Sequence, residues 1–317
     1  MEVIPRSASR GRAALVELGY PAGDDVPLRA SGRTFSGGGH FGVEIPAINT
    51  FRQLKATIAA LQDQGVYCTR FDETHGSFLL SNAEIGDMLA ICRENGYGLV
   101  VGLGPRPEYD VKATFYRTPF GLEMGRQINN NDAFAHCIDE AFRLCDLGCR
   151  GITVYDVGVL KVLGELRAGG KLPRDLVLKT SSHCMATNPA IAKIFADCGA
   201  DAITTAHDLG LPVLQAMRAA APEAALDIPT DVYLSKGGFI RWFELSELVQ
   251  IAAPMFLKMG ASVQNHPYDS VKPEAAAERV SRVRVGLEYF VANAPEGLKP
   301  IPATDRLVCR PVLPTAA

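Results

Sequence analysis

The sequence predicts an α/β protein built as a single (β/α)8 TIM barrel. From about residue 40, short apolar segments of strand length alternate with longer segments of helical periodicity, and eight such pairs fit before residue 294. Strands that alternate with helices in this way lie parallel, and eight units are the number that closes a barrel. A doubly wound open sheet is the second alternative, but no G-x-G-x-x-G motif follows the first predicted strand.

The eight pairs can be placed along the chain. The strands are expected at residues 40–46, 66–72, 97–104, 149–156, 176–183, 200–207, 226–234 and 254–260. The helices are expected at residues 49–65, 81–96, 132–148, 157–170, 188–199, 208–222, 241–253 and 274–293. Local signals support two of them, because Asn49 and Gly65 flank the first helix and Ser81 stands three residues before Glu84, as in a capping box.

The barrel is expected over residues 40–294, which leaves an N-terminal extension, 1–39, and a C-terminal tail, 295–317. Gly and Pro make both segments irregular. Three roles are open for them: they cover the bottom of the barrel, they reach over its mouth, or they contact a second subunit. The third role implies a homo-oligomer.

The composition of the 317-residue chain is that of an ordinary globular protein, with 47% hydrophobic residues, 21% charged residues and a net charge of -3. No basic stripe with interleaved aromatic residues occurs, so nucleic acid is not expected as a partner. The near-neutral charge and the lack of a bilayer-length apolar run give no reason to expect a membrane. No apolar h-region precedes a cleavage site, so we expect no signal peptide and a cytoplasmic location.

The eight cysteines are expected to be reduced thiols, because the chain shows no export signal. Cys137, Cys145 and Cys149 fall on one predicted helix and the strand after it, and Cys92 and Cys198 occupy apolar positions of other helices. No CxxC pair occurs. Buried thiols that pack as small hydrophobes are the favoured interpretation, and an iron–sulfur cluster or a zinc site is the disfavoured one.

The fifth predicted strand, LVLKTSSH, carries a lysine in a segment that should be buried. Alternate residues of a barrel strand point inward, so Leu176 and Leu178 should meet the helices while Lys179, Ser181 and His183 face the interior. Burying a lysine is unfavourable unless its charge is paired or used.

The same alternation places several more charged side chains inside the barrel. The inward charges are expected to be Glu44, Arg70, Asp72, Lys179, Asp231 and Lys258. A TIM-barrel interior is ordinarily filled by branched apolar side chains. Two interpretations are open, an ion-pair network that fixes the strand register and a functional site, and the number of charges favours the site.

Lys179 has three candidate roles. Burial lowers the pKa of a lysine, so its amine could attack a carbonyl and form a Schiff base. Lys179 and Lys258 could instead act as general acid and base groups with Asp231, Glu44 or His183. In the third case both lysines stay protonated and hold a carboxylate or phosphate of the substrate.

Further polar residues are expected near the carboxyl ends of the strands, where TIM-barrel sites lie. The predicted catalytic residues are Lys179, His183, Asp231 and Glu44, and the predicted substrate-binding residues include Arg70, Asp72, Arg106, Asp156, Ser181, His207, Tyr233, Lys258 and His266. Arg106 follows the third strand and His266 follows the eighth. For each of these two, a solvated loop is the alternative.

No cofactor is predicted for this site, and a divalent metal is the alternative. Glu44, Asp72, His183 and His207 supply oxygen and nitrogen atoms of the kinds that metals prefer. No H-x-H or H-E-x-x-H spacing selects them as a set.

The stretch CGADAITTAHDLGLPVLQAMRAAAPEAALDIPTDVYL, residues 198–234, resembles the U32 peptidase-like family. Asp208, Leu209 and Leu211 match the end of that family's helix–strand–helix motif. The segment NPAIAKIFADCG is similar to the helix that precedes the motif. The resemblance implies the TIM-barrel fold.

The resemblance also implies that the loop after the seventh strand, with Lys236 and Arg241, borders the site and binds substrate there. The family's His-Gly-x-x-Cys loop and its Ser-Gly-x-Cys are absent, and SKGGFIRW, residues 235–242, stands in their place. Neither the peptidase activity nor the iron–sulfur cluster of the family is therefore carried over to this chain.

Together these observations predict a TIM-barrel enzyme that acts on a small polar substrate bearing a carboxylate or carbonyl group. Lyase or hydrolase chemistry centred on Lys179 is the main hypothesis. A metal-dependent hydrolase and a non-catalytic U32-like subunit of a hetero-complex are the alternatives.

Overall fold

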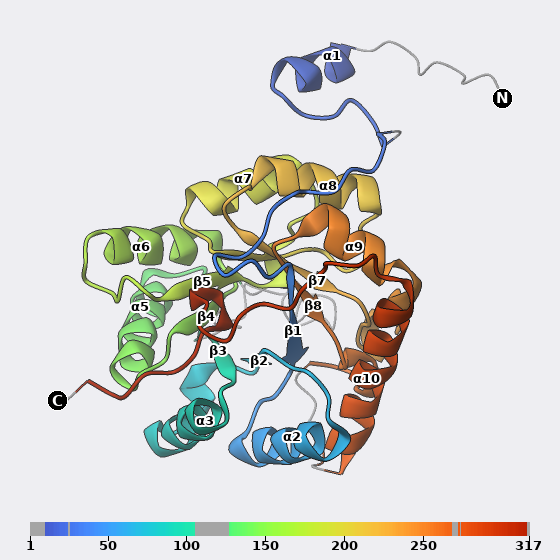
Figure 1. Ribbon diagram of the computed structural model, residues 1–317. Helices are drawn as coiled ribbons and strands as arrows, with labels where there is room; N and C mark the ends of the chain where they lie inside the picture. Colours follow the sequence, from blue (N-terminus) through green and yellow to red (C-terminus); the bar gives the residue numbers. More distant parts are fainter. Residues whose placement is uncertain (1–9, 25, 105–126, 268–271, 273, 316–317) are drawn as a thin grey trace.

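Eight parallel strands close into a barrel in the order β1 to β8, so the predicted TIM barrel is confirmed (Figure 1). The computed structural model describes residues 10–24, 26–104, 127–267, 272 and 274–315. The strands are β1 (Phe41–Pro46), β2 (Arg70–Glu73), β3 (Gly98–Gly102), β4 (Gly151–Val154), β5 (Val177–Thr180), β6 (Ala202–Thr204), β7 (Ala225–Pro229) and β8 (Met255–Lys258).

The helices from α2 to α10 surround the barrel and cover its outer face, whereas α1 projects away from it (Figure 1). The described helices are α1 (Arg10–Glu17), α2 (Phe51–Gln64), α3 (Asn82–Asn95), α5 (Asn131–Asp146), α6 (Val157–Ala168), α7 (Pro189–Asp197), α8 (Leu211–Ala220), α9 (Leu245–Ala252) and α10 (Ala275–Asn293). The capping signals are partly confirmed. Ser81 accepts a hydrogen bond from the Glu84 N–H, whereas Thr50, and not Asn49, caps α2.

The outward-facing strand residues form the main core with the helices. Val43, Ile45, Leu178, Leu226 and Leu257 are fully or almost fully buried in one large apolar cluster. Removing this apolar area from water is the principal stabilising contribution to such a barrel. The strand residues that face the barrel interior include the buried charged side chains and a smaller apolar cluster.

The seventh strand ends earlier than predicted, at Pro229 rather than at residue 234. Beyond it the Thr230 N–H and hydroxyl bond to the Lys258 carbonyl oxygen, and Asp231 forms an isolated antiparallel bridge with Ile240. Asp231 and Tyr233 therefore lie in the loop after β7, above the barrel and not within it. A period-two pattern that continues past the end of a strand is the reason for this error.

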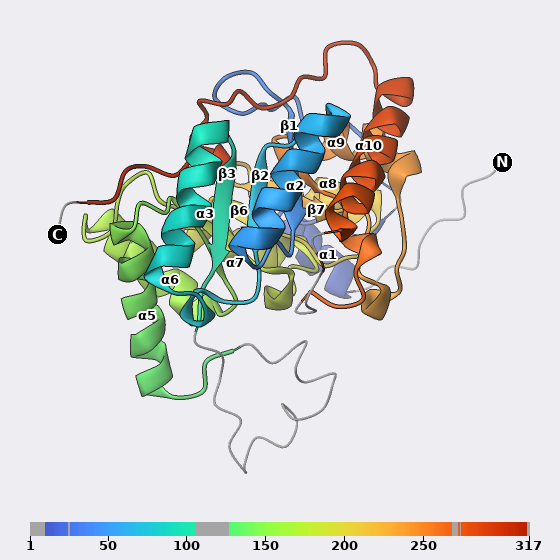
Figure 2. The ribbon, with the colours of Figure 1, turned by 90° about the horizontal axis from the view of Figure 1, so that it is seen from below.

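The segment before β1 and the C-terminal tail lie across the same end of the barrel (Figure 2). The Ile301 N–H bonds to the Phe41 carbonyl oxygen, and the Leu99 N–H bonds to the Cys309 carbonyl oxygen. A second apolar cluster closes this end, formed by Phe35, Ala202, Ala225, Phe256, Ile301 and Val308. Because these contacts lie at the amino ends of the strands, the tail covers the bottom of the barrel and leaves the mouth to other loops.

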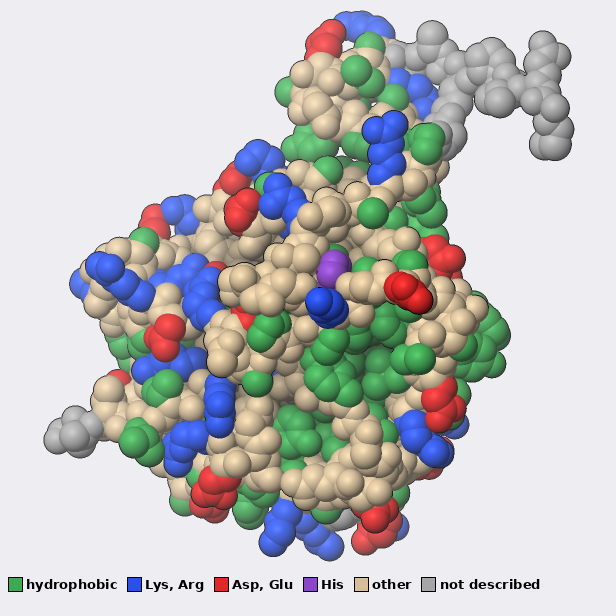
Figure 3. Space-filling model, in the orientation of Figure 1, with side chains coloured by type: hydrophobic (Ala, Val, Ile, Leu, Met, Phe, Trp, Pro, Cys, Tyr) green, Lys and Arg blue, Asp and Glu red, His purple; other side chains and the backbone are tan. Residues whose placement is uncertain are grey.

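Basic and acidic side chains are interspersed over the face shown in Figure 3, and hydrophobic side chains gather on its right-hand half. Among the described helices, none combines the length and the apolar character needed to cross a bilayer.

Candidate active site

A cluster of six buried charges occupies the middle of the barrel. Three are acidic and three are basic, and we call Glu44, Arg70, Asp72, Lys179, Asp227 and Lys258 the charge cluster. The strand register explains part of it, because Glu44 on β1 is level with Arg70 on β2 and with Lys258 on β8. Equal numbers of acids and bases allow the charges to be buried together, since each would be unfavourable alone.

Lys179 lies at the centre of the charge cluster and is fully buried. Its Nζ is 2.6 Å from Glu44 Oε1, 2.8 Å from Asp72 Oδ2 and 3.5 Å from Asp227 Oδ2. The predicted inward orientation of Lys179 is confirmed. Three carboxylates around one ammonium compensate the buried charge with ion pairs.

Lys258 contacts the same two carboxylates from the side of the mouth. Its Nζ lies 2.8 Å from Asp72 Oδ2 and also donates to Glu44 Oε1. Unlike Lys179, its side chain keeps 11% of its surface exposed. Lys258 is therefore the ammonium of the charge cluster that a bound molecule can reach.

Arg70 and Asp227 form the lower part of the charge cluster. Arg70 donates from Nε to Glu44 over 2.7 Å, from Nη2 to Asp227 over 2.6 Å and from Nη1 to the Leu307 carbonyl oxygen over 2.7 Å. Its guanidinium also stacks on Phe256, with the central carbon 3.5 Å from the ring centroid. Arg70 therefore lies deep in the barrel and not at its mouth. The sequence predicts that Arg70 contacts the substrate, but its side chain does not line the pocket described below.

The neighbouring charges decide the ionisation of the charge cluster. Burial opposes the charge of Glu44, but Lys179, Lys258 and Arg70 outweigh it and hold the pKa of Glu44 well below its ordinary value. Burial likewise opposes the charge of Lys258, but Asp72, Glu44 and Asp227 raise its pKa well above the ordinary value. For Asp227, burial prevails over Arg70 and raises the pKa of the carboxyl group.

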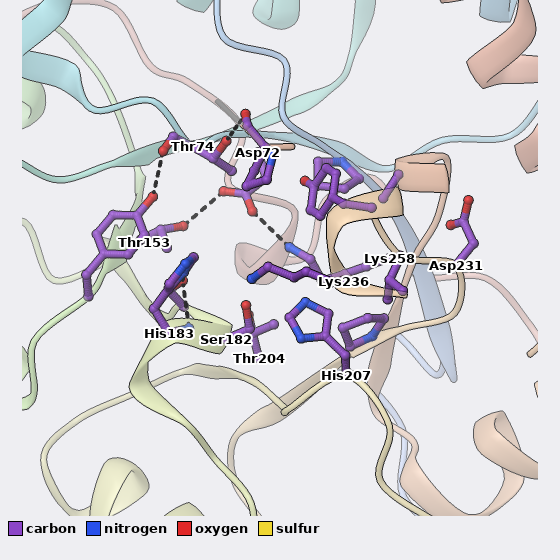
Figure 4. A pocket seen from close by; sticks show the side chains of 18 residues that line it. Asp72, Thr74, Thr153, Ser182, His183, Thr204, His207, Asp231, Lys236 and Lys258 are labelled. Carbon is purple, nitrogen blue, oxygen red and sulfur yellow. Dashed lines mark hydrogen bonds and ion pairs between the residues drawn. The ribbon is translucent and has the colours of Figure 1, made fainter. Parts of the chain in front are cut away.

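A pocket opens above the charge cluster at the carboxyl ends of the strands (Figure 4). This inner pocket holds about 550 Å³ of empty space, including the part open to solvent. It is lined by Pro46, Asp72, Thr74, Thr153, Tyr155, Ser181, Ser182, His183, Thr204, His207, Pro229, Asp231, Val232, Tyr233, Lys236, Lys258, Ala261 and Pro267. Asp72 and Lys258 form its charged floor, and Lys179 lies one layer below them.

One wall of the inner pocket is built from the ends of β4 and β5. The Ser181 hydroxyl lies 3.1 Å from His183 Nδ1, and the Tyr155 ring packs edge-on against the imidazole with centroids 5.9 Å apart. The Tyr155 hydroxyl donates to the Thr74 carbonyl oxygen. These contacts hold the His183 ring, which is 8% exposed, in one orientation at the edge of the pocket.

The loops after β6 and β7 bring His207 and Lys236 to the inner pocket. Burial, followed by the charges of Lys236 and Lys258, lowers the pKa of His207 to about 3. The imidazole is therefore neutral at physiological pH, and it offers one donor and one acceptor to a ligand. Lys236 lies at the border of the site, in the position that the resemblance to the U32 peptidase-like family implies.

Asp231 has both carboxylate oxygens engaged by the loop after β8. Oδ1 accepts from the Gly260 N–H over 2.7 Å, and Oδ2 accepts from the Ser262 N–H over 3.1 Å and its hydroxyl over 2.7 Å. In Figure 4 its carboxylate points away from the centre of the pocket. These contacts suit a residue that positions the loop, and a role of Asp231 in catalysis stays a prediction.

Two other predicted residues, Asp156 and His266, lie outside the inner pocket. Asp156 caps α6, where its carboxylate accepts from the N–H groups of Val159 and Ile128. His266 does not line the inner pocket, although its neighbour Pro267 does. Arg106 lies outside the described residues.

Sequence reasoning missed several residues that the fold brings to this site. Asp227 lies inside β7, four residues before Asp231, so the alternation that predicts an inward Asp231 predicts an inward Asp227 as well. This spacing was a usable signal for a further buried carboxylate. Thr153 donates to Asp72 over 3.0 Å, and the buried Thr204 hydroxyl has no hydrogen-bond partner among the described residues. Thr residues are common in strands, and nothing in the sequence distinguishes these two.

The metal alternative gains no support from the geometry. Within the part of the chain that the structure describes, no three His, Cys, Asp or Glu side chains lie close enough to hold a metal ion. Glu44 and Asp72 instead bind the two lysines. The cysteines are free thiols, and burial raises the pKa of Cys145, Cys149 and Cys309 to about 12.

No protein-family model matches the sequence, and no curated protein matches it either. Among solved structures, a U32 peptidase is 14% identical with a TM-score of 0.42, over 72% of this chain and 96% of its own. The YdjI aldolase from Escherichia coli K12 is 11% identical with a TM-score of 0.45, over 80% and 91% of the two chains. An oxaloacetate acetylhydrolase, solved with the product oxalate, is 14% identical with a TM-score of 0.41, over 85% and 89%.

A U32 peptidase is thus among the solved structures to which this chain is distantly similar, as the resemblance in residues 198–234 predicted. Similarities of this size concern the fold, because one barrel supports many unrelated reactions. The activity of this chain has to be argued from its own side chains.

Proposed function

We propose that this protein is an enzyme that cleaves a bond next to a carbonyl group in a small carboxylate-bearing molecule, by lyase or hydrolase chemistry. The observation that carries the proposal is the Lys258 ammonium, which is held at the floor of the inner pocket by Glu44 and Asp72. Fixed cations of this kind bind carboxylate or carbonyl oxygens and stabilise negative charge that develops on them.

The reaction proceeds through an anion. In the lyase case the bond between the carbons α and β to the carbonyl breaks: a hydroxyl on the β carbon gives up its proton and becomes a carbonyl, and the electron pair stays on the other fragment as an enolate. In the hydrolase case water adds to the carbonyl and loses a proton, and the tetrahedral oxyanion then expels the neighbouring carbon, which takes up the proton. Both cases place negative charge on an oxygen. Lys258 donates a hydrogen bond to that oxygen, and its raised pKa keeps it cationic throughout. The charge is already oriented by two carboxylates, so little reorganisation accompanies its formation.

The two imidazoles at the pocket walls supply hydrogen bonds and proton transfer. His207 is neutral, so it can donate to a carbonyl oxygen without first losing a proton. His183 is held by Ser181 and Tyr155 and is the candidate for moving a proton to or from the substrate. The Thr204 hydroxyl, which has no hydrogen-bond partner in the described part of the chain, can bond a substrate oxygen beside Lys258.

Lys179 supports this arrangement from below. Its ammonium is surrounded by Glu44, Asp72 and Asp227, and it does not line the inner pocket. A substrate carbonyl in the pocket therefore does not reach its amine, which favours the third role considered above over a Schiff base on Lys179. Lys179 remains central because it orients the two carboxylates that hold Lys258.

The proposal is tested with a panel of 2-oxo acids, hydroxy acids and aldehydes, with conversion followed by proton NMR and binding by calorimetry. We expect at least one 2-oxo acid to bind and to be cleaved. Lys258→Met should weaken binding about 10- to 100-fold, because a charge-assisted hydrogen bond is lost, and Lys258→Arg should restore part of it. Treatment with borohydride during turnover should leave no mass adduct on Lys179.

Lys193→Met is the matched control, because Lys193 is an exposed lysine on α7 that forms a solvent-exposed ion pair with Asp197. It should leave binding and conversion unchanged. Lys179→Met should destabilise the fold by about 3–5 kcal/mol, because it leaves buried carboxylates uncompensated. Failure of every acid to bind, or unchanged binding in folded Lys258→Met, would contradict the proposed function.

A further inference from the structure

A second pocket adjoins the inner pocket, and the two share a wall. This outer pocket is lined by Ser182, His183, Met185, Ala206, His207, Asp208, Lys236 and Phe239. Four of these residues, Ser182, His183, His207 and Lys236, also line the inner pocket. Figure 4 shows the shared residues Ser182, His183, His207 and Lys236 among the side chains that line the inner pocket. A molecule bound at Lys258 can therefore extend past the histidines into the outer pocket.

The residues that belong to the outer pocket alone are mainly apolar. Met185 is 40% exposed, Ala206 is buried and Phe239 is half-buried. Asp208 is exposed and is the acidic member of this set. The inner pocket thus offers cations and hydroxyls to a polar group, while the outer pocket offers hydrophobic contact.

Backbone hydrogen bonds fix the apolar walls in place. The Ala206 N–H bonds to the Ala186 carbonyl oxygen over 3.0 Å, which ties the loop after β6 to the loop that carries Met185. The Val232 N–H bonds to the Phe239 carbonyl oxygen over 3.1 Å, which joins the two sides of the loop after β7 and holds Phe239 in place. Preformed walls bind a substituent without first being ordered.

The charges select against a doubly anionic ligand. Lys258 and Lys236 can hold one carboxylate in the inner pocket. A second carboxylate at the far end of the ligand would come to lie beside Asp208, where like charges repel. The favoured ligand has one acidic end and one apolar end.

We propose that the outer pocket is a specificity subsite for an alkyl or aryl substituent of the substrate. The inference rests on the proposed function and narrows its substrate class to monocarboxylates that carry a carbonyl group and an apolar side chain. The histidines and Lys236 stand at the junction, next to the bond between the polar part and the substituent.

The test compares four 2-oxo acids by calorimetry: pyruvate, 4-methyl-2-oxopentanoate, 3-phenylpyruvate and 2-oxoglutarate. Each buried CH₂ group contributes about fourfold in affinity, so the branched and aromatic acids should bind at least about tenfold more tightly than pyruvate. The dicarboxylate 2-oxoglutarate should bind no better than pyruvate.

Phe239→Ala should reduce the advantage of the two larger acids to about twofold and leave the affinity for pyruvate unchanged. Phe239→Leu should keep most of the advantage. Phe243→Ala is the matched control, because Phe243 is a nearby phenylalanine that is 78% exposed and lines neither pocket. Thermal unfolding of each variant checks that it is folded.

The outcomes separate the subsite from the function. If pyruvate binds and the larger acids bind no more tightly, or if 2-oxoglutarate binds most tightly, the subsite is wrong and the proposed function stands. The subsite is also wrong if folded Phe239→Ala keeps the full preference. If no acid binds to the wild-type protein, the proposed function itself fails and the subsite falls with it.

Discussion

At the scale of single residues, six charged side chains occupy the barrel interior, where layers of branched apolar residues are usual. Each would lose several kcal/mol of hydration alone, and breaking such a pair typically destabilises a protein by about 3–5 kcal/mol. The charge cluster is tolerated because its acids and bases are equal in number. Its unequal exposure matters for function, since Lys258 faces the pocket and Lys179 does not.

His207 gives a prediction about pH. Its pKa is about 3 in the folded protein and about 6.5 in an unfolded chain, so between these values the unfolded chain binds a proton that the folded protein does not. Stability should therefore fall as the pH drops below about 6.5. In His207→Asn, the loss of unfolding free energy between pH 7.5 and pH 5 should be smaller by about 1–2 kcal/mol.

Urea unfolding at the two pH values measures this difference. His136→Asn is the control, because His136 lies on α5 with 71% of its side chain exposed. That variant should lose as much stability on acidification as the wild-type protein does. An equal loss in His207→Asn would show that His207 is not held neutral.

At the scale of the elements, the strands are short and the loops at their carboxyl ends carry the site. The loops after β5, β6 and β7 supply both histidines and Lys236. Specific polar contacts help to hold these loops in place. Asp231 illustrates this, since it joins the loop after β7 to the loop after β8 through three hydrogen bonds.

Asp231→Ala should leave the Gly260 N–H and both donors of Ser262 without their acceptor. Buried donors that lose their partner typically reduce stability by about 1–3 kcal/mol. Ser262→Ala removes the hydroxyl bond and keeps the two N–H bonds, so its loss should be clearly smaller. Chemical denaturation compares the two variants, and equal losses would argue against the loop-positioning role.

At the scale of the whole molecule, the C-terminal tail completes the barrel from below. It packs Val308 and Ile301 against Phe256, and its Leu307 carbonyl oxygen accepts from Arg70 of the charge cluster. Arg70 therefore connects the tail to the site, because it contacts Leu307 below and Glu44 of the charge cluster above. Gly98 on β3 is needed for this approach, because a Cβ there would lie 1.5 Å from the Val308 carbonyl oxygen.

Gly98→Ala should force the tail away from the barrel and reduce the unfolding free energy by about 3 kcal/mol. Limited proteolysis should also cut the tail earlier than in the wild-type protein. Gly86→Ala is the control, because a Cβ at that position of α3 meets nothing within 4 Å. Alanine is the better helix former, so that variant should gain about 0.5–1 kcal/mol. Equal stability of the two variants would contradict this account of the tail.

The sequence by itself determined the barrel, the order of its strands and helices, and the inward orientation of Lys179, Glu44 and Asp72. Those features follow from local periodicity, since a strand repeats every two residues and a helix every 3.6. The resemblance in residues 198–234 added the position of the loop with Lys236.

Only the tertiary structure decided how deep each inward residue lies and which of its neighbours it meets. The alternation along each strand predicts that both Lys179 and Lys258 point inward. Yet three carboxylates enclose Lys179, whereas Lys258 faces the pocket. Depth depends on the stagger between strands from distant parts of the chain and on where each strand ends. Residue periodicity carries no information about either, so the pairing of Asp227 with Arg70 and the outer pocket beside His207 became visible only in the folded molecule.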